Sequence, residues 1–253
     1  MEAAAQVHLH LREASMLLDV VETVPFTALS YYHRYNDHQE QQRRRQQQQP
    51  LPPPPLPPPD DGAACSNSVV DDGCLGSDDL ASACLFLASK SEDQPRRIRD
   101  VINALYRVRH GQPLYESKEY WRLKERLVQH EELLLCALAF DPNAELPHPF
   151  LFHYLRLLRA PQPLCTLSSA LLNDSACSAA SSRRAPNVRA AAAIALAAGL
   201  VGVPLPERWW LVVDVDDDLL LCASKEIAGI YESTCESTVV SGEVDGESHS
   251  NPR

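Results

Sequence analysis

The stretch ACLFLASKSEDQPRRIRDVIN, residues 83–103, joins two predicted helices through a short charged turn. Its first part is apolar with helical spacing, and charge then arrives together at Lys90, Glu92 and Asp93. Pro95 follows, a residue suited to the first turn of a helix, and a second amphipathic pattern begins directly after it. The stretch holds no candidate nucleophile, metal clamp or phosphate loop, so its charged junction needs another explanation.

The composition of the chain favours an all-α protein. Its 253 residues are 45% hydrophobic, which is enough for a core, and only 9 are glycine. Leucine and alanine dominate the patterned regions, whereas the alternation expected of β-strands is almost absent. The net charge of −11 argues against a protein that binds nucleic acid by neutralising phosphates.

Cysteine usage and the longest apolar run predict an intracellular protein, in the nucleus, the cytoplasm or both. The 8 cysteines form no CxxC pair, and several lie inside apolar helical patterns, as reduced cysteines do. The first residues lack the basic and apolar regions of a secretory signal. The apolar run at 190–203 is too short to span a bilayer and predicts a buried helix. We therefore expect no membrane association.

Helical spacing and cap signals predict about five helices on each side of residue 143. Those of the first half are expected over residues 7–24, 25–35, 78–90, 95–111 and 117–139. Those of the second half are expected over residues 148–160, 163–175, 185–202, 206–213 and 216–233. A Ser/Ala-rich loop is expected at 176–185. Of the adjacent Trp209 and Trp210, one is predicted to lie in the core and the other to be partly exposed.

Two segments are predicted to be disordered. The Gln/Pro-rich insertion at about 39–76 cannot bury apolar surface, and its PLPPPPLPP run has the PxxP spacing that SH3 or WW modules bind. A tolerated disordered insertion is the simpler interpretation, because long surface loops cost little closure entropy. The acidic, serine-rich tail at 233–253 is the second such segment.

Two charged residues lie where an apolar side chain is expected. Glu131 shares its helix face with Leu127 and Leu134, and Lys90 closes a helix whose Leu87 is apolar. A carboxylate on a leucine stripe must be paired, hydrogen-bonded or placed where the stripe reaches the surface. A Lys90–Glu131 ion pair would explain both positions. The alternative is that each is a lone surface charge, which contributes little to stability.

The same stretches resemble a known family. Residues 83–103 resemble the third and fourth helices of a cyclin box, and VQHEELLLCALAFD (128–141) resembles the fifth. HPFLFHYLRLL (148–158) looks like the start of a second cyclin fold, and WWLVV and KEIAGIYE follow in the family's order. The resemblance covers residues 7–36 and 77–232 and is greatest to the cyclin Q type.

The resemblance implies two tandem five-helix domains, an N-terminal cyclin box at 1–142 and a C-terminal cyclin fold at 143–232. It implies a regulatory subunit that binds and activates a cyclin-dependent kinase, cyclin-dependent kinase ten being the partner expected for the cyclin Q type. The residues matching the family's kinase contacts are Lys90 and Glu131, flanked by Glu92, Asp93, Arg97 and Arg99.

Two other functions stay open at this point. One is a transcription cyclin of the L, K or T type, and the other is a cyclin-fold adaptor related to general transcription factors that contacts DNA. The acidic composition argues against the adaptor. No catalytic residues, metal ligands or cofactors are expected: the pairs His8/His10 and His148/His153, for example, lack neighbouring ligands at metal-binding spacing.

Overall fold

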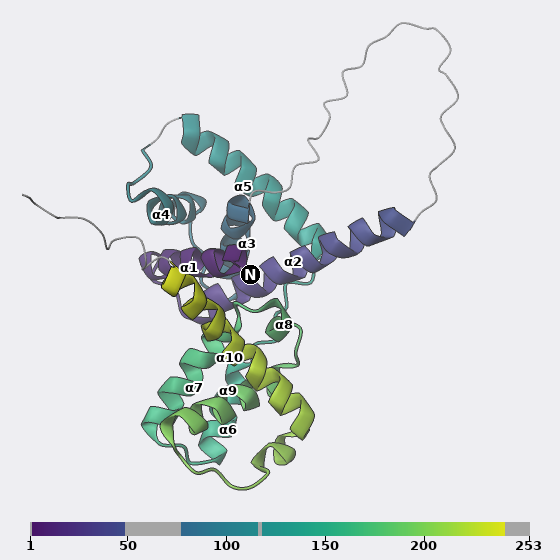
Figure 1. Ribbon diagram of the computed structural model, residues 1–253. Coiled ribbons are helices and arrows are strands. Elements are labelled where there is room, and N and C mark those ends of the chain that lie inside the picture. Colours follow the sequence, from purple (N-terminus) through teal and green to yellow (C-terminus); the bar gives the residue numbers. More distant parts are fainter. Residues whose placement is uncertain (1, 49–76, 116–117, 241–253) are drawn as a thin grey trace, which may run out of the picture. The chain divides into compact units, whose positions relative to one another are not determined.

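The computed structural model describes residues 2–48, 77–115 and 118–240, and every regular element in these ranges is a helix (Figure 1). The all-α prediction is thereby confirmed for the described residues. The chain divides into two compact units. One runs from Leu9 to Asn143, and the other comprises the start of the chain up to His8 and the chain from Ala144 onward.

The first unit is built around one central helix. Its helices are the part of α1 (Glu2–Leu17) from Leu9 onward, α2 (Thr23–Gln48), α3 (Ser77–Ser91), α4 (Ile98–His110) and α5 (Lys118–Ala137). Helix α3 packs against α2, α4 and α5, and Figure 1 shows it surrounded by them. Its Cys84, Leu85 and Ala88 are fully buried, because α3 is apolar on nearly every side between Leu80 and Ala88. This central position brings the end of α3 next to α5.

Helix α2 extends further than the sequence analysis expected. Residues 39–48, assigned there to a disordered insertion, continue α2 as far as Gln48. Arg44 donates to the Glu40 carboxylate one turn earlier at 2.5 Å, and glutamine, arginine and glutamate are good helix formers. The prediction that residues 39–48 are disordered is therefore wrong. The proline-rich part of the insertion lies outside the described residues.

The second unit also has a central helix. It contains α6 (His148–Leu157), α7 (Gln162–Ser175), α8 (Ala179–Ser182), α9 (Pro186–Val201), the short 3-10 helix η1 (Trp209–Val213) and α10 (Asp217–Val240). Helix α9 packs against α6, α7 and α10. It is buried on most sides from Val188 to Ala198, as predicted for the alanine-rich run, and Trp209 is buried while Trp210 is partly exposed.

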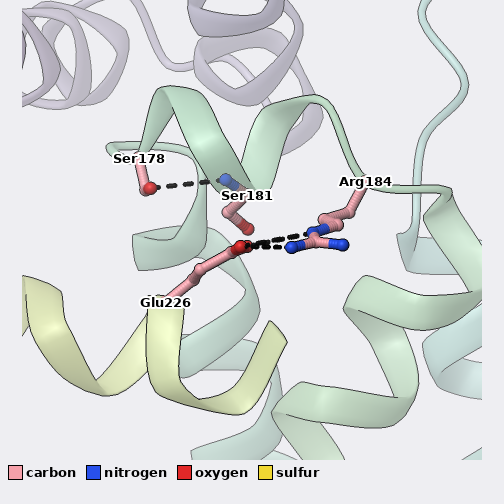
Figure 2. A network of polar contacts seen from close by, with 4 residues as sticks. All are labelled: Ser178, Ser181, Arg184 and Glu226. Atoms are coloured by element: carbon pink, nitrogen blue, oxygen red, sulfur yellow. Dashed lines mark hydrogen bonds and ion pairs between the residues drawn. The ribbon is translucent and has the colours of Figure 1, made fainter. Parts of the chain in front are cut away.

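A short helix stands where a loop was expected at 176–185. Ser178 caps α8, because its hydroxyl accepts a hydrogen bond from the Ser181 N–H at 3.3 Å. Just after α8, the Arg184 guanidinium donates to the Glu226 carboxylate of α10 at 2.6, 3.2 and 3.3 Å (Figure 2). Such a forked contact favours one geometry, so it ties the α8–α9 connection to α10.

The last helix also exceeds its predicted length. Helix α10 continues to Val240, so the tail predicted to be disordered from residue 233 begins as helix, and residues 241–253 lie outside the described part of the chain. None of the helices in the described ranges combines the length and the apolar character needed to cross a membrane.

Candidate partner-binding site

The charged end of α3 is shaped by backbone hydrogen bonds that stop the helix. The Glu92 N–H donates to the Ala88 carbonyl at 3.0 Å, and the Gln94 N–H donates to the Ser89 carbonyl at 2.9 Å. Between them, Asp93 has a left-handed φ of 55°, a conformation that aspartate tolerates better than most residues. The chain therefore leaves α3 sharply and presents Lys90 at the end of the helix.

Lys90 and Glu131 form an ion pair that joins the end of α3 to α5. The Glu131 side chain is only 14% exposed, whereas the Lys90 side chain is 41% exposed. The Lys90 ammonium also lies 4.3 Å from the centroid of the Phe86 ring. The predicted pairing is confirmed, and the lone-charge alternative does not apply to either residue.

Apolar residues stand one turn before and one turn after Glu131 on α5. Leu127 and Leu134 on its face are buried. Val128, one turn before Glu131, is 50% exposed, and Leu135, one turn after it, is half-buried. The ion pair thus lies where a buried stripe reaches the surface, and an apolar side chain is exposed beside it.

The flanking charged residues occupy different positions. The Glu92 carboxylate accepts a hydrogen bond from the Thr27 hydroxyl of α2 at 2.8 Å, so it is engaged within the unit. Asp93 is exposed in the turn, and Arg97 and Arg99 are exposed where α4 begins. The structure brings Lys90 and Glu131 together, whereas the other four charges spread over the adjoining α3–α4 junction.

Several residues that hold this junction were not identified from the sequence. The buried Tyr31 of α2 donates to the Pro142 carbonyl at 2.5 Å, and its phenolic oxygen lies 2.8 Å from Ser91 Oγ. Burial raises the pKa of the Tyr31 phenol above its ordinary value, so the hydroxyl remains a neutral donor at physiological pH. A tyrosine within an apolar helix signals that its hydroxyl needs a partner, but not which one.

The turn between α1 and α2 holds the same junction from another direction. The Gln94 side chain accepts from the Val21 N–H at 3.1 Å, and the Arg96 guanidinium donates to the Asp19 carbonyl at 2.5 Å. The α3–α4 junction is therefore fixed by contacts with residues 60 or more positions earlier in the chain.

Comparisons with known proteins agree with this architecture. No family model matches the chain. It is 36% identical to Cyclin-L1 of Gallus gallus over 162 residues, which are 60% of this chain and 30% of the relative. It is 33% identical to Cyclin-L2 of Mus musculus over 181 residues, 67% of this chain and 35% of the relative. The chain spans about a third of the length of these curated relatives.

A solved structure matches most of the chain. One chain of the yeast RNA Pol II CTD kinase CTDK-1 complex superposes with a TM-score of 0.67 at 17% identity, covering 93% of this chain and 66% of that one. At this identity the likeness shows the fold alone, and that fold agrees with the helical fold predicted from the sequence. The relatives support the cyclin family for this chain.

Within the family, the comparisons correct one expectation. The relatives found are L-type cyclins, so they favour the L type, which was an alternative, over the cyclin Q type. The resemblance to the cyclin Q type rests on short stretches spread from RDVIN (99–103) to KEIAGIYE (225–232), whereas the relatives match over 162 and 181 residues.

Proposed function

We propose that this chain is a regulatory subunit that binds a cyclin-dependent kinase and stabilises its active conformation, and that it performs no chemistry itself. The observation that carries the proposal is the Lys90–Glu131 ion pair at the surface where α3 meets α5. It lies in a chain similar to L-type cyclins. The resemblance to the cyclin box matches its two residues with the family's kinase contacts.

The pair is chemically suited to bind the backbone of another protein. An ammonium has three donors and a carboxylate several acceptor sites, so each can keep its partner and still bind a backbone carbonyl or N–H. The ion pair holds both groups in place before the partner arrives, which lowers the cost of ordering them. Glu92, Asp93, Arg97 and Arg99 would complement charges around this contact.

Such binding would activate the kinase by shifting a conformational equilibrium. In kinases, the αC helix must be in position for its glutamate to pair with the lysine that contacts the nucleotide. A subunit that binds αC only in that position stabilises the active state by its differential affinity for the two states.

The L-type relatives favour a kinase of the transcription class as the partner. The matching solved structure is a complex of a kinase for the RNA polymerase II C-terminal domain, so we propose a peptide repeat of that domain as the substrate of the assembled enzyme. Cyclin-dependent kinase ten, the partner expected for the cyclin Q type, belongs in the same panel of candidates. An intracellular location follows from either partner.

Co-purification with a panel of cyclin-dependent kinases tests the proposal. The double variant Lys90→Ala/Glu131→Arg should lose kinase binding and peptide phosphorylation while its helical circular dichroism spectrum is retained. The matched control is Glu119→Arg/Arg122→Ala, which disrupts an exposed ion pair on the same helix α5 and should bind as wild type does. Kinase binding by the Lys90/Glu131 variant at the wild-type level would contradict the assignment of the site.

A further inference from the structure

The second unit has an open apolar groove between α9 and α10. Its volume is about 780 Å³. Glu207, Arg208 and Trp210, in and just before η1, also line it. The walls carry Leu196 and Leu200 from α9 and Leu220 and Leu221 from α10. This groove lies wholly within residues 144–240 and is separate from the Lys90–Glu131 site in the first unit.

Large apolar side chains at the edges of the groove face solvent. Leu200 is 66% exposed and Leu221 is 54% exposed. Leu220, which also lines the groove, is buried and belongs to the core of the unit. The groove therefore has a floor that is part of the core and edges whose apolar area is uncovered, as in sites that take up a helix.

A glycine lies on the α9 side of the groove. Gly199 lines it and stands within a helix made mainly of alanine and leucine, where glycine is an unfavourable residue. A Cβ added there would meet nothing within 4 Å, and Gly199 is not among the glycines with positive φ. The fold of the described residues thus requires no glycine at this position, and the missing side chain leaves open space beside the α9 backbone.

One wall is a tryptophan held in a fixed orientation. The Trp210 indole Nε1–H donates to the Asp217 carboxylate at 2.5 Å, and the ring packs edge-on against buried Trp209. The polar atom of the Trp210 indole is already bonded to Asp217. The apolar face of the ring can therefore contact a partner in the groove.

The charges around the groove are mainly acidic. Glu207 and Asp217 line it together with one base, Arg208. Three further exposed acids flank the same segment, at Asp214, Asp216 and Asp218. This excess of carboxylates favours a partner with basic residues beside its apolar ones, and disfavours another copy of this acidic chain.

From these observations we infer that the groove binds an amphipathic helix of a partner protein, with leucine-type side chains on one face and lysine or arginine at its ends. The leucines of the partner would cover Leu200 and Leu221, and one of its side chains would occupy the open space beside Gly199. The basic ends would lie beside the acids that precede α10. This inference is independent of the proposed kinase site and holds whether or not a kinase is bound.

Fluorescence anisotropy with a synthetic peptide tests this inference on the full chain. The labelled peptide carries leucines at i, i+3, i+4 and i+7 and lysines at both ends. It should bind wild type, and Gly199→Leu should weaken binding at least about tenfold by filling the groove. Gly199→Ala, the matched control, adds one carbon and should bind within about twofold of wild type. Glu207→Gln/Asp214→Asn should weaken binding and reduce its dependence on salt.

Several outcomes would overturn the inference. They are absence of binding to wild type, equal binding by Gly199→Leu, or equal binding of a peptide with the same composition in scrambled order. A wild-type dimer that Gly199→Leu converts to a monomer would instead assign the groove to a second copy of the chain. If Gly199→Leu loses its circular dichroism spectrum, Leu200→Ser/Leu221→Ser replaces it, because both side chains are exposed, and unchanged binding by that variant would equally reject the inference.

Discussion

At the scale of single residues, Tyr31 is the side chain that ties the proposed kinase site to the rest of its unit. Its hydroxyl contacts both the end of α3 and the backbone after α5. We expect Tyr31→Phe to lower the free energy of unfolding by about 1 kcal/mol, because the Pro142 carbonyl loses its donor. Urea denaturation followed by circular dichroism measures this, and an unchanged midpoint would contradict it.

Tyr31→Phe should also change how the free energy of unfolding depends on pH under alkaline conditions. Burial raises the pKa of the folded Tyr31 phenol, whereas the unfolded phenol titrates near about 10. The stabilisation is therefore complete below the unfolded pKa and is lost as pH rises through the folded pKa, since only the unfolded state readily releases the proton. Above about pH 10, wild type should lose stability more steeply than Tyr31→Phe. Parallel curves would exclude this contribution.

Cysteine reactivity should separate buried from exposed thiols. Cys84 is fully buried in α3, and burial raises its thiol pKa, which disfavours the reactive thiolate. Cys136 and Cys222 are exposed. Iodoacetamide followed by peptide mass spectrometry should label both in the native protein and Cys84 only after denaturation. Native labelling of Cys84 at the rate of Cys136 would show that α3 is not the centre of its unit.

Only some contacts of the proposed kinase site are predictable from the sequence. The Lys90–Glu131 pair followed from a charge on a leucine stripe, which spacing along one helix reveals. Thr27 and Tyr31 could not be found that way, because their partners Glu92 and Ser91 are 60 or more residues away and are set by tertiary packing.

At the scale of helices, glycine at one helix end has a clear structural role. Gly111 ends α4 with φ 68°, and its N–H donates to the Arg107 carbonyl at 2.8 Å. Gly111→Ala should lower the free energy of unfolding by about 1 kcal/mol, because a Cβ is strained in this conformation. Gly199→Ala is the matched control and should leave stability equal or higher, since its position is ordinary helix with open space. Thermal unfolding compares the two, and equal effects would contradict the distinction.

Helix positions were predictable from the sequence, but helix ends were less so. The centres of α3, α5 and α9 followed from strong apolar spacing. The low hydrophobicity of 39–48 predicts disorder and hides the extension of α2 to Gln48. The segment nevertheless contains neither glycine nor proline, and Pro50 is the first stop signal. Helix α8 has only four residues, too few to show a period.

At the scale of the whole molecule, the second unit has what a domain needs to fold alone. Its core is continuous around α9, with Ile194 fully buried, and the Arg184–Glu226 contact links the α8–α9 connection to α10. We expect residues 144–240, expressed alone, to be helical and to unfold in one cooperative transition.

A core substitution makes that prediction quantitative. In the isolated fragment, Ile194→Ala should lower the free energy of unfolding by about 2–5 kcal/mol, because it leaves a cavity among the closely packed side chains around α9. Leu219→Ala is the matched control, since Leu219 is exposed on α10 and its truncation should cost far less. Urea denaturation of the three fragments measures both effects. A non-cooperative fragment, or equal losses from the two substitutions, would show that the packing around α9 does not stabilise the unit by itself.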